Sequence, residues 1–319
     1  MPFGWRRRVS VEGKVVLVTG SSRGLGLCLA RELSRRGAKV AITARDTEEL
    51  GHVAAELGDV FAVPCDLADT GQIVDMVHEV VSALGPIDVL INNAGIIQVG
   101  PMESMTLDNY EYAMKVHLWA PLHLIDTVLP SMRERGSGHI VNVSSVGGRI
   151  AVPHLLPYSV SKFALVGLSR GLRVELRKHG IFVTTVCPGL MRTGSPRHAT
   201  FKGKNDLEYA WFATASTMPI LSIEVNRAAR RIVDALERGK AELVLGVPAK
   251  LGVLAQAVSP SLTAILLSLV DRALPKPGGI GTAEAKGSES ETKDLPRWVR
   301  APLREAERAN NELVDGSGA

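Results

Sequence analysis

Cysteine is scarce in this chain, which has three in 319 residues. Cys28, Cys65 and Cys187 are odd in number and widely separated, so they do not suggest a disulfide framework. Reduced thiols in a cytoplasmic protein are the better interpretation. Residues 1–9 form a basic arm that leads into residues 11–14 without an apolar segment, so the sequence predicts no secretory signal.

Aromatic residues make up only 4% of the chain, and the formal net charge is a mild +4. The basic residues do not gather into a dense stripe with interleaved aromatics, which argues against a nucleic-acid partner. Apart from His117, considered below, the histidines show no spacing typical of metal ligands, so we expect no metal site.

The sequence also lacks a clean membrane-spanning run. Residues 251–270 carry no charge, but Gln256, Pro260 and several hydroxyl residues interrupt the roughly 20 apolar residues that a span needs. We expect two short apolar helices that break at Ser259 and Pro260. They could form a subunit interface, cover the substrate site or contact a membrane surface peripherally.

Glycine, serine, glutamate and lysine dominate the chain from Pro275 onward. This composition predicts that residues 276–294 are a disordered linker and that 276–319 as a whole is a disordered or weakly structured tail. The exception that we expect is a short polar helix over residues 305–313, to which the sequence assigns no function.

The chain has, by contrast, a regular alternation of apolar, β-branched runs with helical patterns. The expected strands cover residues 14–18, 39–43, 61–63, 87–91, 139–143 and 181–186. Residues 105–132 are expected to be mostly helical, with a kink at Pro121. The alternation predicts an α/β fold: a Rossmann-type doubly wound parallel sheet of about seven strands, with helices on both faces and a helical C-terminal extension.

A glycine-rich segment, residues 19–26, lies between the first strand and the first helix. Its glycines permit a tight turn, and the helix that follows offers free N–H groups to a phosphate. The carboxyl ends of parallel strands meet at one edge of the sheet. Residues 92–95, Ser145 and residues 188–193 are therefore expected beside this loop, and the convergence predicts a dinucleotide site.

The end of the second strand indicates which dinucleotide binds. An acidic residue there would favour the ribose hydroxyls of NAD(H). This chain has Ala44 and Arg45 instead, with Arg23 in the glycine loop. Two guanidinium groups suit a 2′-phosphate, so NADP(H) is favoured over NAD(H). Asp66, after the third strand, could meet the adenine amino group or cap the helix that begins near Thr70.

Tyr158 and Lys162 are four residues apart in an expected helix and so share one face. A nearby ammonium favours phenolate and lowers the tyrosine pKa from its usual value of about 10. Ser145, at the end of the fifth strand, could donate a second hydrogen bond to the same substrate oxygen. Together these groups could protonate a carbonyl oxygen while a hydride is delivered.

At this point the sequence resembles the short-chain dehydrogenase/reductase family over roughly residues 10–248. The matching motifs, in order, are Thr-Gly-x-x-x-Gly-x-Gly at 19–26, Asn-Asn-Ala-Gly at 92–95, the serine thirteen residues before the tyrosine, Tyr-x-x-x-Lys at 158–162 and Pro-Gly-x-x-x-Thr at 188–193. The resemblance implies a catalytic domain at 10–248, and the uncharged run described above places an apolar helical extension after it, at 249–275. It also implies a dimer or tetramer.

The resemblance implies roles for the catalytic residues. Tyr158 would be the proton donor in reduction and the base in alcohol oxidation. Lys162 would lower its pKa and bind the nicotinamide ribose, and Ser145 would hold the substrate oxygen. The cofactor-binding residues that the patterns and the resemblance give are Gly20, Ser22, Arg23, Gly24, Leu25, Gly26, Arg45, Asp66, Leu67, Asn93, Ala94, Gly95, Tyr158, Lys162, Pro188, Gly189 and Thr193.

One catalytic position departs from the family pattern. His117 stands where the family has an asparagine that supports a water between the lysine and solvent. One hypothesis is that His117 preserves this relay and makes turnover depend on its own protonation. The alternative is a packed histidine with an impaired relay.

Residues 194–223 lie where the family has its substrate lid. The apolar set Phe201, Tyr209, Trp211, Phe212 and Met218 favours an apolar substrate such as a lipid-like ketone, although packing within the lid explains it equally well. The basic set Arg192, Arg197, His198 and Lys202 could instead attract an anion. We therefore expect an NADP(H)-dependent oxidoreductase that interconverts carbonyl and secondary alcohol, the alternative being an NADP(H) sensor or scaffold with catalysis weakened at His117.

Overall fold

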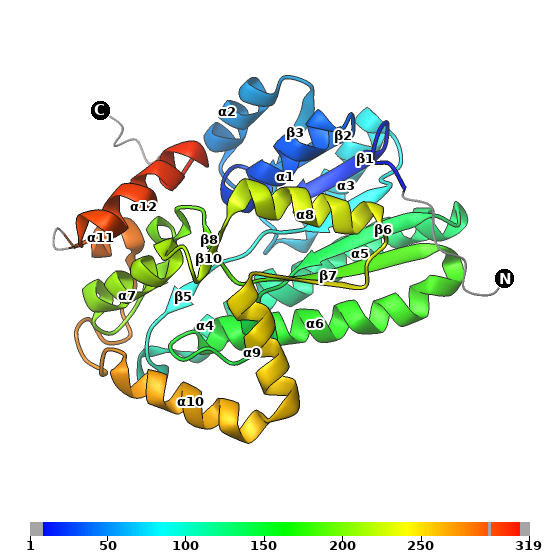
Figure 1. The fold of residues 1–319 in the computed structure, drawn as a ribbon. Helices are drawn as coiled ribbons and strands as arrows, with labels where there is room; N and C mark the ends of the chain where they lie inside the picture. Colours follow the sequence, from blue (N-terminus) through cyan, green and yellow to red (C-terminus); the bar gives the residue numbers. More distant parts are fainter. Residues whose placement is uncertain (1–8, 293–294, 313–319) are drawn as a thin grey trace.

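A seven-stranded parallel sheet with the strand order β11-β7-β6-β4-β1-β2-β3 forms the centre of the computed structural model (Figure 1). The structure describes residues 9–292 and 295–312, so the basic arm lies outside the described residues except for Val9. The strands are β1 (Val15–Thr19), β2 (Lys39–Ala44), β3 (Val60–Pro64), β4 (Val89–Asn92), β6 (Gly138–Val143), β7 (Ile181–Pro188) and β11 (Glu242–Leu245). The expected doubly wound sheet is confirmed.

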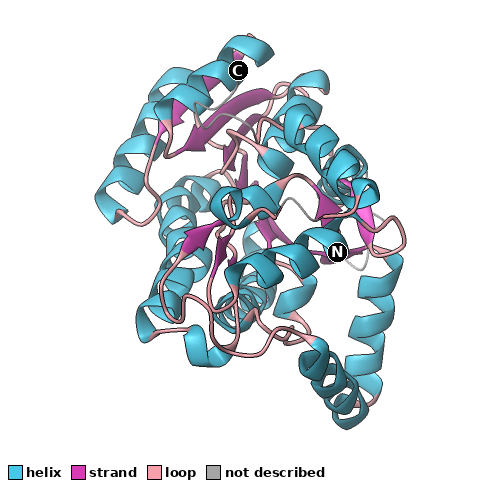
Figure 2. Cartoon of the chain, turned by 90° about the vertical axis from the view of Figure 1, so that its left-hand side faces the viewer, coloured by secondary structure: helices cyan, strands magenta, loops and turns pink. Residues whose placement is uncertain are grey.

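Helices cover both faces of this sheet (Figure 2). One face packs against α1 (Gly24–Arg35), α2 (Thr47–Leu57) and α8 (Val225–Glu237). The other packs against α3 (Thr70–Leu84), α5 (Ala120–Glu134) and the end of α6 (Leu156–Leu176). Strand β1 is apolar throughout because its side chains alternate between two buried faces. Val16 and Val18 pack into the first core, on the side of α1, and Leu17 packs into the second core, on the side of α3.

The long helical segment after β4 is irregular, as expected, but the irregularity precedes Pro121. Helix α4 (Leu107–Met114) passes into a π-helical turn, Lys115–Trp119, and then into α5. Proline has no N–H group, so Pro121 cannot donate the helical hydrogen bond that the carbonyl of His117 would otherwise accept. The wider turn that results places His117 in the core.

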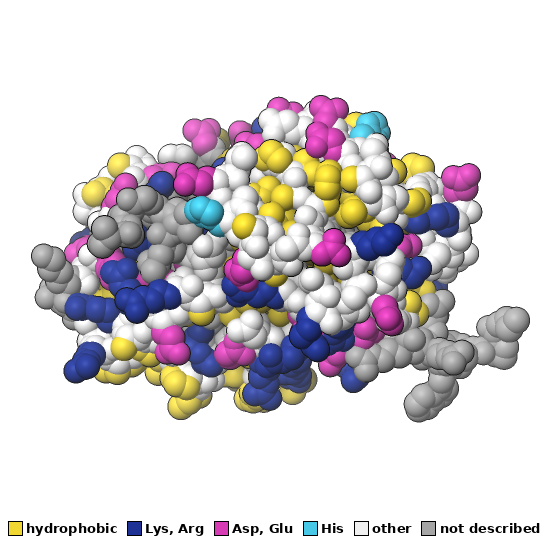
Figure 3. All heavy atoms as spheres, turned by 90° about the horizontal axis from the view of Figure 1, so that it is seen from above, with side chains coloured by type: hydrophobic (Ala, Val, Ile, Leu, Met, Phe, Trp, Pro, Cys, Tyr) yellow, Lys and Arg dark blue, Asp and Glu magenta, His cyan; other side chains and the backbone are white. Residues whose placement is uncertain are grey.

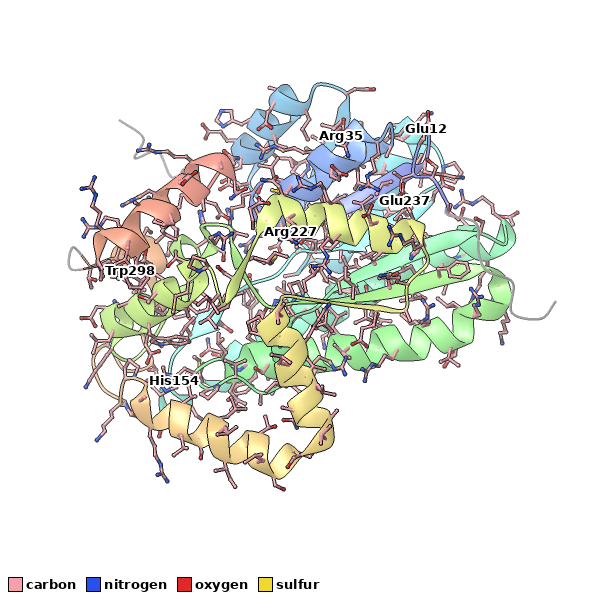
Figure 4. All side chains as sticks on the ribbon, viewed as in Figure 1. Glu12, Arg35, His154, Arg227, Glu237 and Trp298 are labelled. Atoms are coloured by element: carbon pink, nitrogen blue, oxygen red, sulfur yellow. The ribbon has the colours of Figure 1, made fainter. Side chains whose placement is uncertain are left out.

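Short elements join the ends of the main strands. Strand β9 (Thr200–Phe201) pairs with β5 (Gln98–Val99) and β12 (Ala285–Lys286), and β8 (Leu190–Arg192) pairs with β10 (Ser222–Glu224). Helix α7 (Asn205–Thr217) follows β9. His154, labelled in Figure 4, has Nδ1 2.8 Å from Glu208 of α7 and Nε2 3.8 Å from Asp271.

The apolar extension forms two helices, α9 (Val247–Val258) and α10 (Pro260–Ala273), which break at Ser259 as the sequence analysis expects. They project from the body of the molecule in Figure 1. Their outward side chains are exposed: Leu251, Leu254, Val258, Leu262, Ile265, Leu266, Leu269 and Val270. Among the described residues, every helix is too short or too polar to cross a lipid bilayer.

The tail differs from the expectation of weak structure. Its described part contains β12, α11 (Gly287–Ser290) and α12 (Arg297–Ala309). Leu295, Val299 and Leu303 are spaced four residues apart and pack in one cluster with Phe201 and Tyr209. A helix needs only this narrow apolar stripe to dock, and the polar composition of the tail conceals it. The expected helix at 305–313 therefore starts earlier, and Leu313 lies outside the described residues.

An ion-pair network ties α1 to α8. The Arg36 guanidinium lies 2.7 Å from Glu32, 2.9 Å from Asp234 and 2.8 Å from Glu237, and its side chain is 15% exposed. Glu32 and Glu237 are nearly buried. Lys, Arg, Asp and Glu are mixed over this side of the molecule, which Figure 3 shows from above.

We expect Arg36→Met to lower the free energy of unfolding by about 3 kcal/mol, because two nearly buried carboxylates lose their bridging cation. Arg35→Met is the matched control. Arg35 also pairs with Glu32, but its side chain is 66% exposed, so water screens the pair and Arg35→Met should destabilise the protein much less than Arg36→Met. Urea denaturation measures both, and equal effects would contradict the assignment.

Candidate active site

The sequence-predicted site residues lie mainly at the carboxyl ends of β1, β4, β6 and β7 and at the start of α6. Parallel pairing of β1 with β4, β4 with β6 and β6 with β7 brings these ends to one edge. Loops that follow neighbouring strands therefore face one another, as they do at ligand sites of open α/β sheets.

The glycine loop is folded tightly onto itself. Gly20 and Gly24 have φ of 63° and 57°, which disfavours a side chain. A Cβ at Gly26 would lie 1.9 Å from the Gly20 carbonyl oxygen, and one at Gly20 would lie 2.7 Å from Ala94. Arg23, the N-cap of α1, makes no side-chain cap, so the start of α1 is available to an anion or to another acceptor.

The Asn-Asn-Ala-Gly segment supports this loop from the end of β4. The Thr19 hydroxyl accepts hydrogen bonds from the N–H groups of Asn93 and Ala94, each at 3.0 Å. The Asn93 side-chain amide donates back to the carbonyls of Thr19 and Gly20 at 2.9 and 3.1 Å. Asn93 therefore positions the glycine loop in addition to lining the predicted cleft.

The predicted 2′-phosphate cations are engaged by protein groups. Arg23 lies 2.9 Å from Glu49, which also accepts a 2.8 Å hydrogen bond from the Ser22 hydroxyl. Arg45 is exposed and donates to the Tyr112 hydroxyl at 3.0 Å. Glu49 could not be predicted from the sequence, because one glutamate in the first turn of a helix carries no signal of a buried contact.

Asp66 does not cap α3, which corrects one of the two roles considered for it. The cap is Asp69, whose carboxylate accepts from the N–H groups of Gly71 and Gln72. Asp66 instead accepts from Ala68 in a local turn. Contact of Asp66 with the adenine amino group stays a prediction that rests on its place after β3. The neighbouring Leu67 is partly buried against the second core.

Ser145 and Tyr158 face each other across the loop between β6 and α6. Ser145 begins a short 3₁₀ turn, Val146–Gly148, and its hydroxyl oxygen accepts from Gly147 at 3.0 Å. A Cβ at Gly147 would lie 3.2 Å from the Tyr158 ring, so glycine permits this approach. Tyr158 is half-buried, and the Ser145 hydroxyl is close enough to lower its pKa by hydrogen bonding.

Lys162 is buried one helical turn after Tyr158. Its Nζ donates to the Val143 carbonyl at 3.0 Å and lies 5.7 Å from the centre of the tyrosine ring. Burial lowers the pKa of Lys162 to about 7. Burial also raises the pKa of Tyr158, more than the Ser145 hydrogen bond lowers it. The pKa of Tyr158 is therefore raised and not lowered as expected, because burial of the phenol disfavours its charged form.

His117 is fully buried beside these residues. Its Nε2 accepts a 3.0 Å hydrogen bond from the Ile96 N–H group, so the proton of the neutral ring lies on Nδ1, 2.7 Å from the Ser161 hydroxyl. Burial and the Lys162 charge lower the pKa of His117 well below 6.5. The expectation that turnover follows its titration near neutrality is therefore not supported. His117 positions the Asn-Asn-Ala-Gly segment through Ile96.

The loop after β7 completes the edge. Pro188 ends the strand, and the Gly189 N–H group donates to the Leu245 carbonyl at 2.9 Å. Thr193 is buried, and its hydroxyl accepts from the Ser195 N–H group at 3.1 Å. The Thr193 carbonyl accepts from the side chain of Asn310, a tail residue that the sequence analysis did not place in the site.

The lid residues are used mainly in packing. Phe201, Tyr209 and Phe212 are buried with the apolar stripe of the tail, which favours the packing alternative over a substrate pocket for these rings. The basic set also has protein partners: Arg192 binds Ser222, His198 binds Glu312 and Lys202 lies 3.2 Å from Glu284. Neither set is therefore an open recognition surface for substrate.

Comparison with known proteins defines the class. Residues 14–201 match the family model of the short chain dehydrogenases. A dehydrogenase/reductase SDR family protein 7-like from Drosophila melanogaster is 34% identical over 264 residues, covering 80% of this chain and 79% of that protein. The fold and site thus define a nicotinamide-dependent oxidoreductase. The chain belongs to the short-chain dehydrogenase/reductase family.

Solved structures agree with this assignment. A short-chain dehydrogenase from Streptomyces avermitilis is 33% identical with a TM-score of 0.72, covering 82% of this chain and 98% of that one. A blue fluorescent protein from a metagenomic library, solved in complex with NADPH, is 30% identical with a TM-score of 0.64, covering 74% of this chain and 98% of that one.

We expect His117 to be neutral at pH 6.5, with its proton on Nδ1, because burial and the Lys162 charge lower its pKa well below that value and protonation of Nε2 would break the Ile96 hydrogen bond. Nitrogen NMR of histidine-labelled protein detects the tautomer directly. His117→Asn can still accept from Ile96, whereas His117→Leu leaves that N–H group without a partner. His117→Leu should therefore cost about 1–3 kcal/mol more stability than His117→Asn. A titration of the ring between pH 6 and 7 would refute this account.

Proposed function

We propose that the protein is an NADP(H)-dependent oxidoreductase that interconverts a carbonyl compound and a secondary alcohol. The observation that supports this most is the convergence of Ser145, Tyr158 and Lys162 beside Gly95. A Cβ at Gly95 would lie 3.5 Å from Lys162 Nζ and 3.0 Å from His117 Nε2, so only the smallest residue keeps this surface open. A purely structural helix face would not need the serine, the phenol and the ammonium in one place.

The glycine loop, the start of α1 and residues 93–95 suit a dinucleotide, because backbone N–H groups and open glycine surfaces accept its phosphates and ring. When bound there, NADPH would supply the hydride to the carbonyl carbon. Tyr158 would donate its hydroxyl proton to the carbonyl oxygen, and the Ser145 hydroxyl would hold that oxygen by a hydrogen bond. Oxidation of the alcohol reverses these steps, with the Tyr158 oxygen accepting the proton.

Lys162 has two tasks in this proposal. Near neutral pH it exchanges readily between ammonium and amine, since its pKa is about 7, so it can return a proton to the tyrosine after reduction. Its ammonium form also stabilises phenolate. Below pH 7 the ammonium predominates, and it is lost as the pH rises. Reduction is therefore expected to be favoured on the acidic side of neutrality.

NADP(H) is the preferred cofactor in this proposal. Arg23 and Arg45 are the cations available at the adenosine end, although Arg23 would have to share its charge with Glu49. The structure of a related protein in complex with NADPH is consistent with this preference. The substrate is proposed to be an apolar ketone or lipid-like molecule, because Tyr158 borders an apolar cluster on which Ile97 and Val152 also lie and remain only partly buried.

The sensor alternative rests on His117 alone. The hydrogen bond from the Ile96 N–H group to His117 argues against it, because the histidine ring supports the backbone next to Gly95 instead of disrupting it. Cytoplasmic location and a dimer or tetramer stay predictions. Of the three roles considered for α9 and α10, we favour peripheral contact with a membrane surface, because their apolar side chains are exposed.

We expect Tyr158→Phe to lower kcat for carbonyl reduction by about 100-fold or more, since the proton donor is removed. NADPH binding, followed separately by fluorescence, should change less than about threefold, because the ring remains. NADPH consumption with a panel of ketones and aldehydes measures the first effect. Retained turnover in the variant would refute the proposed role of Tyr158, whereas tight binding without turnover in the unaltered protein would favour the sensor.

Flotation with phosphatidylcholine vesicles tests the peripheral contact. The full chain should float, and a variant with Leu262→Gln, Leu266→Gln and Leu269→Gln on α10 should remain at the bottom of the gradient, because less apolar surface enters the lipid. A variant with Met102→Gln, Leu107→Gln and Val174→Gln changes residues elsewhere that are even more exposed, and it should float normally. If the α10 variant instead converts an oligomer to monomers, this face is a subunit interface.

A further inference from the structure

The end of the tail crosses the predicted diphosphate site. The Asn310 carbonyl accepts a 2.9 Å hydrogen bond from the N–H group of Gly24, in the first turn of α1. The Asn311 side chain donates to the Ser22 carbonyl at 2.8 Å, and the Asn310 side chain donates to the Thr193 carbonyl at 3.2 Å. Residues 310–312 thus join the glycine loop to the loop after β7, the two walls between which the dinucleotide would lie.

A carboxylate accompanies these contacts. The Glu312 side chain is 2% exposed and lies 3.2 Å from His198 Nε2 and 3.7 Å from the Arg23 guanidinium. A Cβ at Gly24 would lie 3.0 Å from its other oxygen, and one at Gly194 would lie 3.0 Å from its Cγ. A buried negative charge therefore faces the start of α1 together with two basic side chains, an arrangement that also suits a phosphate.

The geometry of the tail is fixed by its own helix end. Asn310 follows α12, and Asn311 has φ of 57°, in the left-handed region that asparagine tolerates. The Glu312 N–H group donates back to the Glu307 carbonyl at 2.8 Å, which is the hydrogen bond of a Schellman motif. The chain therefore turns sharply after α12 and directs Glu312 into the site.

The rest of the tail anchors this segment to the lid. Leu295, Val299 and Leu303 are buried against Phe201 and Tyr209. Arg304 forms an ion pair with Glu291 at 2.9 Å, and Lys202 Nζ donates a hydrogen bond to the Thr282 carbonyl at 2.8 Å. In Figure 1, α12 runs from the side of α7 toward α1, with Trp298 on its outer side in Figure 4. Residues 310–312 are thus attached, through α12, to residues 194–223, which border the predicted substrate site.

We propose that residues 310–312 are an autoinhibitory segment that competes with the cofactor diphosphate for the start of α1. The inference depends on the proposed NADP(H) site. The Gly24 N–H group can serve the Asn310 carbonyl or a phosphate oxygen but not both with good geometry, and a second anion beside Glu312 would be repelled. Cofactor binding therefore requires the segment to leave, and release of α12 from α7 would loosen the lid at the same time.

Direct binding of NADPH to variants of the full chain tests the competition. The triple variant Asn310→Ala, Asn311→Gly and Glu312→Ala removes the side-chain contacts while glycine keeps the left-handed turn. It should bind NADPH about tenfold more tightly than the unaltered chain, because loss of one charge-assisted contact changes an equilibrium by at least that factor. Glu312→Gln alone should shift affinity in the same direction. Glu305→Gln makes the same change of charge on the exposed side of α12 and should have no effect.

Hydrogen exchange of the unaltered chain gives a second readout that needs no variant. Amides of residues 306–312 should exchange faster when NADPH is added, since the segment leaves. Slower exchange, or weaker NADPH binding by the triple variant, would show that the segment instead closes over the cofactor and would overturn the inference. Equal affinity in all variants would also overturn it. Failure of NADPH to bind either chain would remove the proposed cofactor site and this inference together.

Discussion

The hydrogen bonds between Thr19 and Asn93 fix the relation of the glycine loop to the catalytic edge. They cross from β1 to β4 and use backbone and side-chain groups at both ends, so neither loop can move independently. The next residues, Ala94 and Gly95, contact Gly20 on one side and approach His117 and Lys162 on the other. The proposed dinucleotide-binding residues and the proposed proton-transfer residues are thus parts of one connected edge of the sheet.

Buried ionisable groups at this edge carry a cost that the fold must offset. Lys162 is buried with one backbone acceptor, and the desolvation of its ammonium is visible in its lowered pKa. His117 and Tyr158 meet edge to face, with ring centres 5.4 Å apart, and both are held in the neutral form by burial. A group of buried acids and bases with shifted pKa values is typical of a catalytic centre and unusual in a purely structural core.

The sheet, and the place of the proposed catalytic residues at one edge of it, could be predicted from the sequence, because both depend on local patterns. Buried parallel strands are continuously apolar, and a turn that needs positive φ selects glycine. Partners were not predictable where they lie far apart in the chain. The sequence around Glu49 does not indicate its contact with Ser22, and the sequence around Glu312 does not indicate its contacts with Arg23 and His198. The pKa direction of Tyr158 was wrong for a related reason, since helical spacing gives the distance to Lys162 but not the burial of both.

The tail shows how composition can mislead about order. Only Leu295, Val299 and Leu303 in a largely polar stretch are needed to dock α12, because the partner surface on α7 is already apolar. Once α12 is docked, the Asn310 carbonyl accepts from the Gly24 N–H group, one of the N–H groups that a helix start leaves without a partner in its own helix. Those groups need a partner whether or not a phosphate is present. An acidic segment that satisfies them when the cofactor is absent lowers the cost of an open anion site, and it must also oppose the ligand for which the site is shaped.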